Sequence, residues 1–76
     1  MVTDNIYEYN TLYKVHMMRY DRLKKETSHF INLIGKFYKN PEYNGDIFMI
    51  IRESGVSHIR MKNTRYYWEV IDYYQL

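Results

Sequence analysis

The sequence predicts an α+β protein, in which a long N-terminal helix, or a helical pair, is followed by a small three-stranded antiparallel meander. Two observations predict the helical part. Residues 5–38 contain no proline and a single glycine, Gly35, and their large apolar side chains recur at helical spacing. The third observation predicts the meander, because short apolar runs alternate with turn-forming residues after Pro41. We therefore expect a single domain over 1–76, helical at 5–39, a loop at 40–46 and β-rich at 47–75.

A continuous seam of ten positions favours the helix. These positions are separated alternately by three and four residues, and the resulting 3.5-residue period is that of a coiled coil. Thr3 or Asp4 is suited to cap the start of the helix, and Asn40-Pro41 ends it. The seam residues are Ile6, Tyr9, Tyr13, His16, Tyr20, Leu23, Thr27, Phe30, Ile34 and Phe37.

The length of this helical region predicts self-association. One unbroken helix of about 33 residues would be about 50 Å long, which is more than a compact chain of 76 residues can cover. Glu26-Thr27-Ser28 is a weak point at which the helix can break into a helical hairpin, and both alternatives remain open. For the unbroken helix, we expect a homodimer that covers the seam.

The C-terminal half contains three candidate strands. Residues 47–52 and 56–62 are apolar or alternating and flank the turn-forming Glu53-Ser54-Gly55. Residues 65–75 are rich in aromatic and β-branched side chains, which favours a third strand over a helix. As a strand, this tail would place Trp68 and Val70 on one face, whereas a helix remains the alternative.

Composition excludes several classes of protein. The chain has no cysteine, so disulfides and cysteine-based zinc sites are absent. Of its three histidines, His16 and His29 would lie about 20 Å apart on a straight helix, so we expect no metal, cofactor or catalytic site. No segment has the length and apolarity of a membrane span or the order of a signal peptide, and we expect a soluble, cytoplasmic protein.

Charge and aromatic residues point to a macromolecular partner. Residues 14–39 carry seven lysines and arginines against two acids, and the tail adds tyrosine, tryptophan and arginine. These three residue types are enriched at protein interfaces, and their rings also stack on bases. Glu69 and Asp72, beside the rings in sequence, are expected to repel phosphate. The predicted partner-binding residues are Arg19, Arg22, Lys24, Lys25, Arg60, Lys62, Arg65, Tyr66, Trp68, Tyr73 and Tyr74.

Residues 51–64 also have some features of a helix-turn-helix. Gly55-Val56-Ser57 is a common turn in that motif, and Arg60 and Lys62 would then lie on a helix that contacts DNA. Ile51 is larger than the small residue that the motif needs four positions before its glycine. A β-hairpin with a charged outer face is therefore the preferred interpretation.

In its length, its tyrosine and isoleucine content and its lack of cysteine, the chain resembles the small early proteins with which bacteriophages of AT-rich hosts disable host machinery. The resemblance implies a non-enzymatic inhibitor that blocks a surface of a host replication, transcription or defence protein in the host cytoplasm. The alternative function is a small nucleic-acid-binding regulator that uses the basic helix and the Arg- and Tyr-rich C-terminal half. The two functions differ in salt dependence, because phosphate binding weakens steeply with salt.

Overall fold

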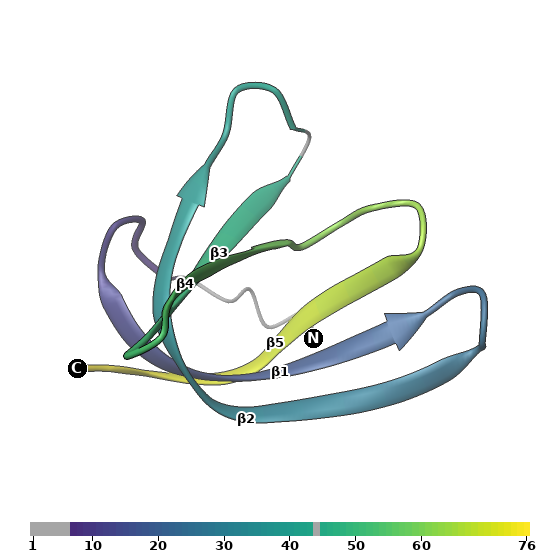
Figure 1. The fold of residues 1–76 in the computed structure, drawn as a ribbon, viewed down its shortest axis with the longest axis horizontal. Helices are drawn as coiled ribbons and strands as arrows, with labels where there is room; N and C mark the ends of the chain where they lie inside the picture. Colours follow the sequence, from purple (N-terminus) through teal and green to yellow (C-terminus); the bar gives the residue numbers. More distant parts are fainter. Residues whose placement is uncertain (1–6, 44) are drawn as a thin grey trace, which may run out of the picture.

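The computed structural model describes residues 7–43 and 45–76, and these residues form one antiparallel β-sheet with no helix among them (Figure 1). The predicted α+β class is therefore wrong, and the protein is all-β over its described residues. Ile6 and the two predicted capping residues, Thr3 and Asp4, lie outside the described residues. The strands are β1 (Leu12–Asp21), β2 (Glu26–Lys39), β3 (Asp46–Arg52), β4 (Gly55–Arg60) and β5 (Tyr66–Gln75).

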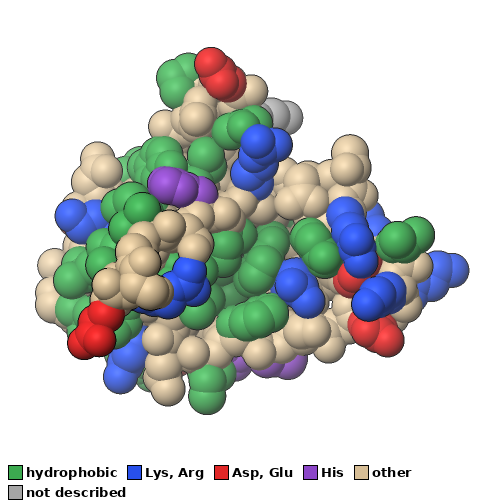
Figure 2. Space-filling model, in the orientation of Figure 1, with side chains coloured by type: hydrophobic (Ala, Val, Ile, Leu, Met, Phe, Trp, Pro, Cys, Tyr) green, Lys and Arg blue, Asp and Glu red, His purple; other side chains and the backbone are tan. Residues whose placement is uncertain are grey.

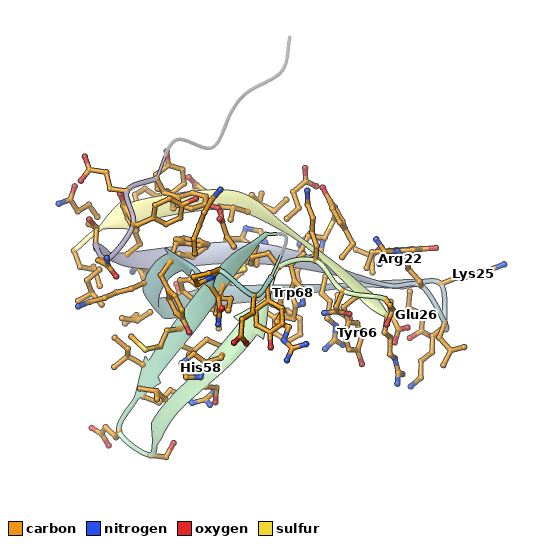
Figure 3. All side chains as sticks on the ribbon, turned by 90° about the horizontal axis from the view of Figure 1, so that it is seen from above. Arg22, Lys25, Glu26, His58, Tyr66 and Trp68 are labelled. Atoms are coloured by element: carbon orange, nitrogen blue, oxygen red, sulfur yellow. The ribbon has the colours of Figure 1, made fainter. Side chains whose placement is uncertain are left out.

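The sheet is a bent ribbon with the strand order β4-β3-β2-β1-β5. The β3–β4 hairpin projects at an angle from the layer formed by β1, β2 and β5 (Figures 1 and 3). At one end, the chain that leaves β4 meets the start of β5, through a Lys62–Tyr67 bridge and a 2.9 Å bond from the amide of Trp68 to the carbonyl of Met61. The result is a partly open barrel.

The segment predicted to be helical, 5–39, contains β1, β2 and the turn between them. Tyr13, Val15 and Met17 are buried, whereas Lys14 is exposed, which is the period-two pattern of a half-buried strand. The seam at steps of three and four overlaps this alternation, since a step of four keeps the same face of a strand and a step of three changes it. Tyr13 and Phe37 are in the core, while Leu23 is in the turn and 74% exposed.

The turn at 22–25 contains neither glycine nor proline, which is why the sequence does not reveal it. One carboxylate oxygen of Asp21 accepts hydrogen bonds from the amides of Leu23 (3.0 Å) and Lys24 (3.1 Å). Lys25 then adopts a left-handed backbone with φ of 55°. The side chain of Asp21 thus stabilises a turn that contains no glycine.

The strands of the C-terminal half are confirmed, but their pairing is different from the predicted one. β3 and β4 form the expected hairpin, so the helix-turn-helix interpretation of 51–64 is wrong. The tail is a strand, β5, but it pairs with β1 instead of continuing a meander from β4. This pairing brings the aromatic tail beside β1.

Two β-bulges bend the sheet at the same level on both sides of β1. In β2, the register shifts between the pairs Val15↔Leu33 and Met17↔Phe30, where Asn32 has φ of 59°. In β5, the shift skips Ile71, because His16 pairs with Asp72 and Met17 with Val70. A bulge increases the local bend and twist of its strand. The paired bulges therefore curve the β2-β1-β5 layer around the core, which comprises Tyr13, Val15, Met17, Phe37, Phe48, Ile50, Met61 and Val70.

Candidate aromatic and basic binding site

Arg19 lies at the centre of a cluster of aromatic rings on the inner face of the sheet. It shares this face with its cross-strand partner on β5, Trp68. Its guanidinium carbon is 4.6 Å from the ring centre of Tyr66, 5.1 Å from that of Phe30 and 5.7 Å from that of Trp68. Three adjacent strands, β2, β1 and β5, thus hold one cation over three rings, an arrangement favoured by the ring quadrupole.

The side chain of Arg19 has no acceptor among the described residues. Its Nε is buried and makes no hydrogen bond, and no carboxylate forms an ion pair with it in the part of the chain that the structure describes. A guanidinium presents a planar set of donors that matches carboxylate or phosphate oxygens. The rings therefore fix the position of Arg19, while no acidic side chain of the described residues pairs with its charge.

A pocket of about 310 Å³ adjoins this cluster at the open side of the barrel. Trp68 and Tyr66 extend from β5 toward the side on which the β3–β4 hairpin projects (Figure 3). The guanidinium of Arg60 lies 4.0 Å from the ring centre of Tyr43, in the loop before β3. The pocket lies between β4 and β5 and is lined by His58, Ile59, Arg60, Asn63, Tyr66 and Trp68.

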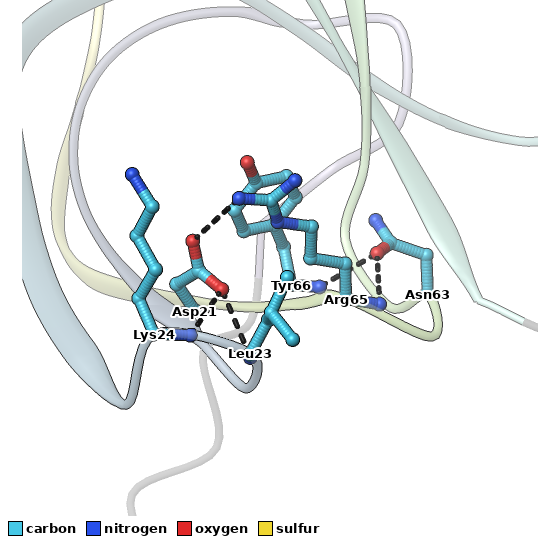
Figure 4. Close-up of polar contacts among 6 residues, drawn as sticks. All are labelled: Asp21, Leu23, Lys24, Asn63, Arg65 and Tyr66. Carbon is cyan, nitrogen blue, oxygen red and sulfur yellow. Dashed lines mark hydrogen bonds and ion pairs between the residues drawn. The ribbon is translucent and has the colours of Figure 1, made fainter.

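A polar network fixes the turn that carries Tyr66 into this pocket (Figure 4). The side-chain oxygen of Asn63 accepts bonds from the amides of Arg65 (3.0 Å) and Tyr66 (2.7 Å). Arg65 in turn donates to the buried carboxylate of Asp21 at 3.3 Å. Arg22 joins the two loops, with its amide bonded to the carbonyl of Arg65 at 2.8 Å and its guanidinium bonded to the carbonyl of Asn63.

The charge of Asp21 is stabilised by this network. Burial by itself would raise the pKa of Asp21, but the amide of Lys24, the guanidinium of Arg65 and the amide of Leu23 together hold it below its ordinary value. Asp21 is thus ionised at neutral pH and engaged by Arg65. It does not neutralise Arg19, although both lie on the inner face of β1.

The two acids of β5 lie on the opposite face from Tyr66 and Trp68. Glu69 pairs with Met18 and Asp72 pairs with His16, and both partners are on the outer face of β1. The expectation that these acids lie beside all of the rings is therefore wrong, because alternation along the strand turns them away from Tyr66 and Trp68, while Tyr67 and Tyr74 share the outer face with them. Lysine and arginine side chains lie beside hydrophobic ones on the face shown in Figure 2.

The structure brings together some of the predicted partner-binding residues and separates others. Arg19, Arg60, Tyr66 and Trp68 form or line the site, and Arg22 and Arg65 support it from the two adjoining loops. Tyr73 and Tyr74 lie near the other end of β5, and Lys24 and Lys25 lie in the β1–β2 turn. Lys62 is exposed in the isolated bridge to Tyr67.

Sequence reasoning missed Asn63, His58 and the role of Phe30 in this site. In the sequence, Asn63 lies between the second and third predicted strands without an assigned role, and Phe30 belongs to the seam. The available signal was the turn at Asn63-Thr64 directly before the aromatic tail, because an asparagine in a turn bonds the following amides. Among the described residues, the other seam residues are divided between core, outer face and turn. They do not form the continuous surface along which the homodimer was expected to associate. The homodimer itself stays an untested prediction.

Comparisons with protein-family models, curated proteins and solved structures found no match. No helix that could cross a membrane occurs in residues 7–43 and 45–76. In the same residues, no cluster of three or more His, Cys, Asp or Glu side chains is arranged to hold a metal ion. The function is therefore inferred from the site itself.

Proposed function

We propose that the protein is a non-enzymatic binding module for single-stranded nucleic acid, and that the strand binds across Arg19, Tyr66 and Trp68. The observation that carries the proposal is the guanidinium of Arg19, which has no acceptor among the described residues and lies over Phe30, Tyr66 and Trp68 beside an open pocket. Aromatic platforms next to free cations are the usual means of binding a single strand, because the rings stack on bases and the cations contact phosphates.

The pocket suits a single planar group. Its volume of about 310 Å³ is at the lower end of the range for ligand pockets, which is about 300–1,000 Å³. Tyr66 and Trp68 supply ring surface, and each base stacked on an aromatic side chain contributes roughly 1–3 kcal/mol. Bases in a duplex are already stacked and paired, so a recessed platform of this kind favours unpaired strands.

The distribution of charge supports the same partner. Arg19 and Arg60 are at the site and Arg65 is near it, whereas Asp21 is engaged by Arg65 and by two amides. The carboxylates of Glu69 and Asp72 are on the outer face of the sheet. A phosphate that approaches the inner face therefore meets cations without the opposing acids that the sequence had indicated.

A protein partner is the second candidate, and the free edge of β4 favours it. In the described sheet, β4 has β3 on one side and no strand along its other side, where the pocket lies. An extended peptide can pair with such an edge and place a side chain among the rings. The expectation of a phage-type inhibitor that blocks a host protein remains a prediction and is compatible with this mode.

Fluorescence of Trp68, the single tryptophan of the chain, provides the test. The protein is titrated with an oligothymidylate of about 15 nucleotides, which matches the site sizes of single-strand binders. We expect quenching that saturates, and weaker binding to a duplex of the same length. Absence of quenching, or equal affinity for the duplex, would reject the proposal and favour the peptide-binding alternative.

Salt dependence separates the two candidates. For contact with about three phosphates, the logarithm of the association constant should fall with the logarithm of salt concentration with a slope of about −2. Binding of a peptide at the edge of β4 should depend less on salt, because main-chain hydrogen bonds and ring burial would dominate it.

A further inference from the structure

The outer face of the sheet carries a pair of histidines that the proposed function does not use. Nε2 of His16 and Nδ1 of His29 are 3.0 Å apart, and their ring centres are 5.2 Å apart. His16 is on β1 and His29 on β2, and His29 is exposed. The expectation that these two histidines lie about 20 Å apart on a helix is therefore wrong.

The bulge in β2 explains how the rings meet. His29 is the cross-strand partner of Met18, so it lies diagonally from His16 on the outer face. Between the pairs Val15↔Leu33 and Met17↔Phe30, β2 contains one more residue than β1, and Asn32 takes up the left-handed conformation there. The pair thus belongs to the same bend that shapes the core.

From this geometry, we propose that His16 and His29 chelate a divalent transition-metal ion, with Cu²⁺ bound most strongly. Two imidazole nitrogens that bind one ion at about 2.0–2.1 Å lie about 2.9 Å apart at a right angle and about 3.3–3.4 Å apart in a tetrahedron. The observed 3.0 Å is closer to the right angle, which is the geometry that Cu²⁺ and Ni²⁺ adopt with nitrogen ligands. Imidazole sites also bind Cu²⁺ most tightly among these ions.

Binding requires the two rings to turn. In the hydrogen-bonded pair, one nitrogen donates its proton to the other, whereas both nitrogens must be unprotonated to bind metal. The donor ring therefore moves its proton to its other nitrogen, and both lone pairs turn toward the ion. Water occupies the remaining positions, since no third side chain of a ligand type joins the pair within the described residues.

The charges on this face favour a cation. Asp72 is the cross-strand partner of His16, and Glu69 is the partner of Met18, which also pairs with His29. Lys14 is on the same face, opposite Tyr74, and is the basic residue of β1 that lies nearest to His16 along this face. Two acids of β5, Asp72 and Glu69, thus lie on the same face as the histidine pair and close to it in the strand register.

Titration with Cu²⁺ alone tests the proposal, with isothermal calorimetry and paramagnetic broadening of NMR signals as the two measurements. We expect one ion per chain, with the broadening strongest at His16 and His29. His16→Gln and His29→Gln should each weaken binding by roughly a hundredfold, because loss of one ligand removes the effective concentration that a chelate provides.

His58→Gln is the matched control, since His58 lies beside Tyr38 on a different part of the sheet. It should leave the affinity for Cu²⁺ unchanged. Equal losses in all three variants, or broadening centred away from His16 and His29, would overturn the proposal. The broadening is measured on the unsubstituted protein, so this result does not depend on the folding of any variant. Trp68 is on the inner face, so failure of nucleic-acid binding would not affect this test.

Discussion

At Arg19, the backbone places a cation over three rings, and no acceptor among the described residues pairs with it. Arg65, by comparison, is paired with Asp21 at 3.3 Å. Two arginines close in space therefore have different surroundings, and in the proposed function Arg19 binds the ligand whereas Arg65 fixes a loop. The difference comes from their neighbours, since the two side chains are chemically identical.

Substitution of Arg19 by methionine should reduce the affinity for oligothymidylate by roughly tenfold or more, because a charge-assisted hydrogen bond contributes about 1.5–3 kcal/mol. Methionine keeps much of the apolar contact with the rings. Lys14→Met is the matched control, because Lys14 is on the same strand but on the outer face, and its replacement removes the same charge. Equal losses of affinity in the two variants would indicate a general charge effect and contradict a specific role for Arg19.

The carboxylate of Asp21 should make stability depend on pH. Its pKa is lowered in the folded protein, so ionised Asp21 contributes stability at neutral pH, and this contribution decreases as pH falls below the ordinary aspartate value of 3.8. Thermal unfolding of Asp21→Asn should show a lower Tm at neutral pH and a smaller change toward acid than the unsubstituted protein. Parallel pH profiles for the two proteins would show that the Asp21–Arg65 network does not stabilise the charge.

At the scale of the elements, the strands in 47–75 could be predicted and the strands in 12–39 could not. The hairpin at 52–55 has a glycine with φ of 124°, which marks a turn in the sequence. The turn after β1 depends on the side chain of Asp21, a residue type that is common in turns, but the turn itself contains neither glycine nor proline and its left-handed residue is Lys25. The extra residue of the bulge in β2 also interrupts the strict alternation of inward and outward side chains. Phe30 and Leu33 therefore lie on the same face although they are three residues apart, which is a helical spacing. A bulged strand can therefore imitate a helix in its apolar pattern.

Substitution of Gly35 tests the close approach of β2 and β3. Gly35 is buried, and a Cβ at this position would meet the carbonyl of Met49 and the ring of Phe48. Gly35→Ala should reduce the free energy of unfolding by about 1–3 kcal/mol, the usual cost of overpacking a core. Urea denaturation measures this change, with Ile34→Ala on the partly exposed neighbour as a control of small effect. A neutral Gly35→Ala variant would contradict the observed approach of the two strands.

For the molecule as a whole, the barrel is closed at one end by the Met61–Trp68 and Lys62–Tyr67 contacts and open between the remainder of β4 and β5. The sequence indicated the residue types of the site, since Arg19, Arg60, Tyr66 and Trp68 were all expected to bind a partner. It could not show that β5 pairs with β1, which is the long-range contact that places Trp68 beside Arg19. Nor could it show the face on which Glu69 lies, because that depends on the register. Part of the composition of the candidate site was therefore predictable, but its geometry and the contributions of Asn63, His58 and Phe30 were not.

The most direct test of the account is an NMR titration of the isotope-labelled protein with an oligothymidylate of about 15 nucleotides. The indole resonance of Trp68 and the signals of Arg19, Tyr66 and Asn63 should shift together and saturate together. The signals of Lys14, His16 and Glu69 on the outer face should change little. Shifts confined to the outer face, or no saturable shift at Trp68, would contradict the claim that the inner aromatic face is the binding surface.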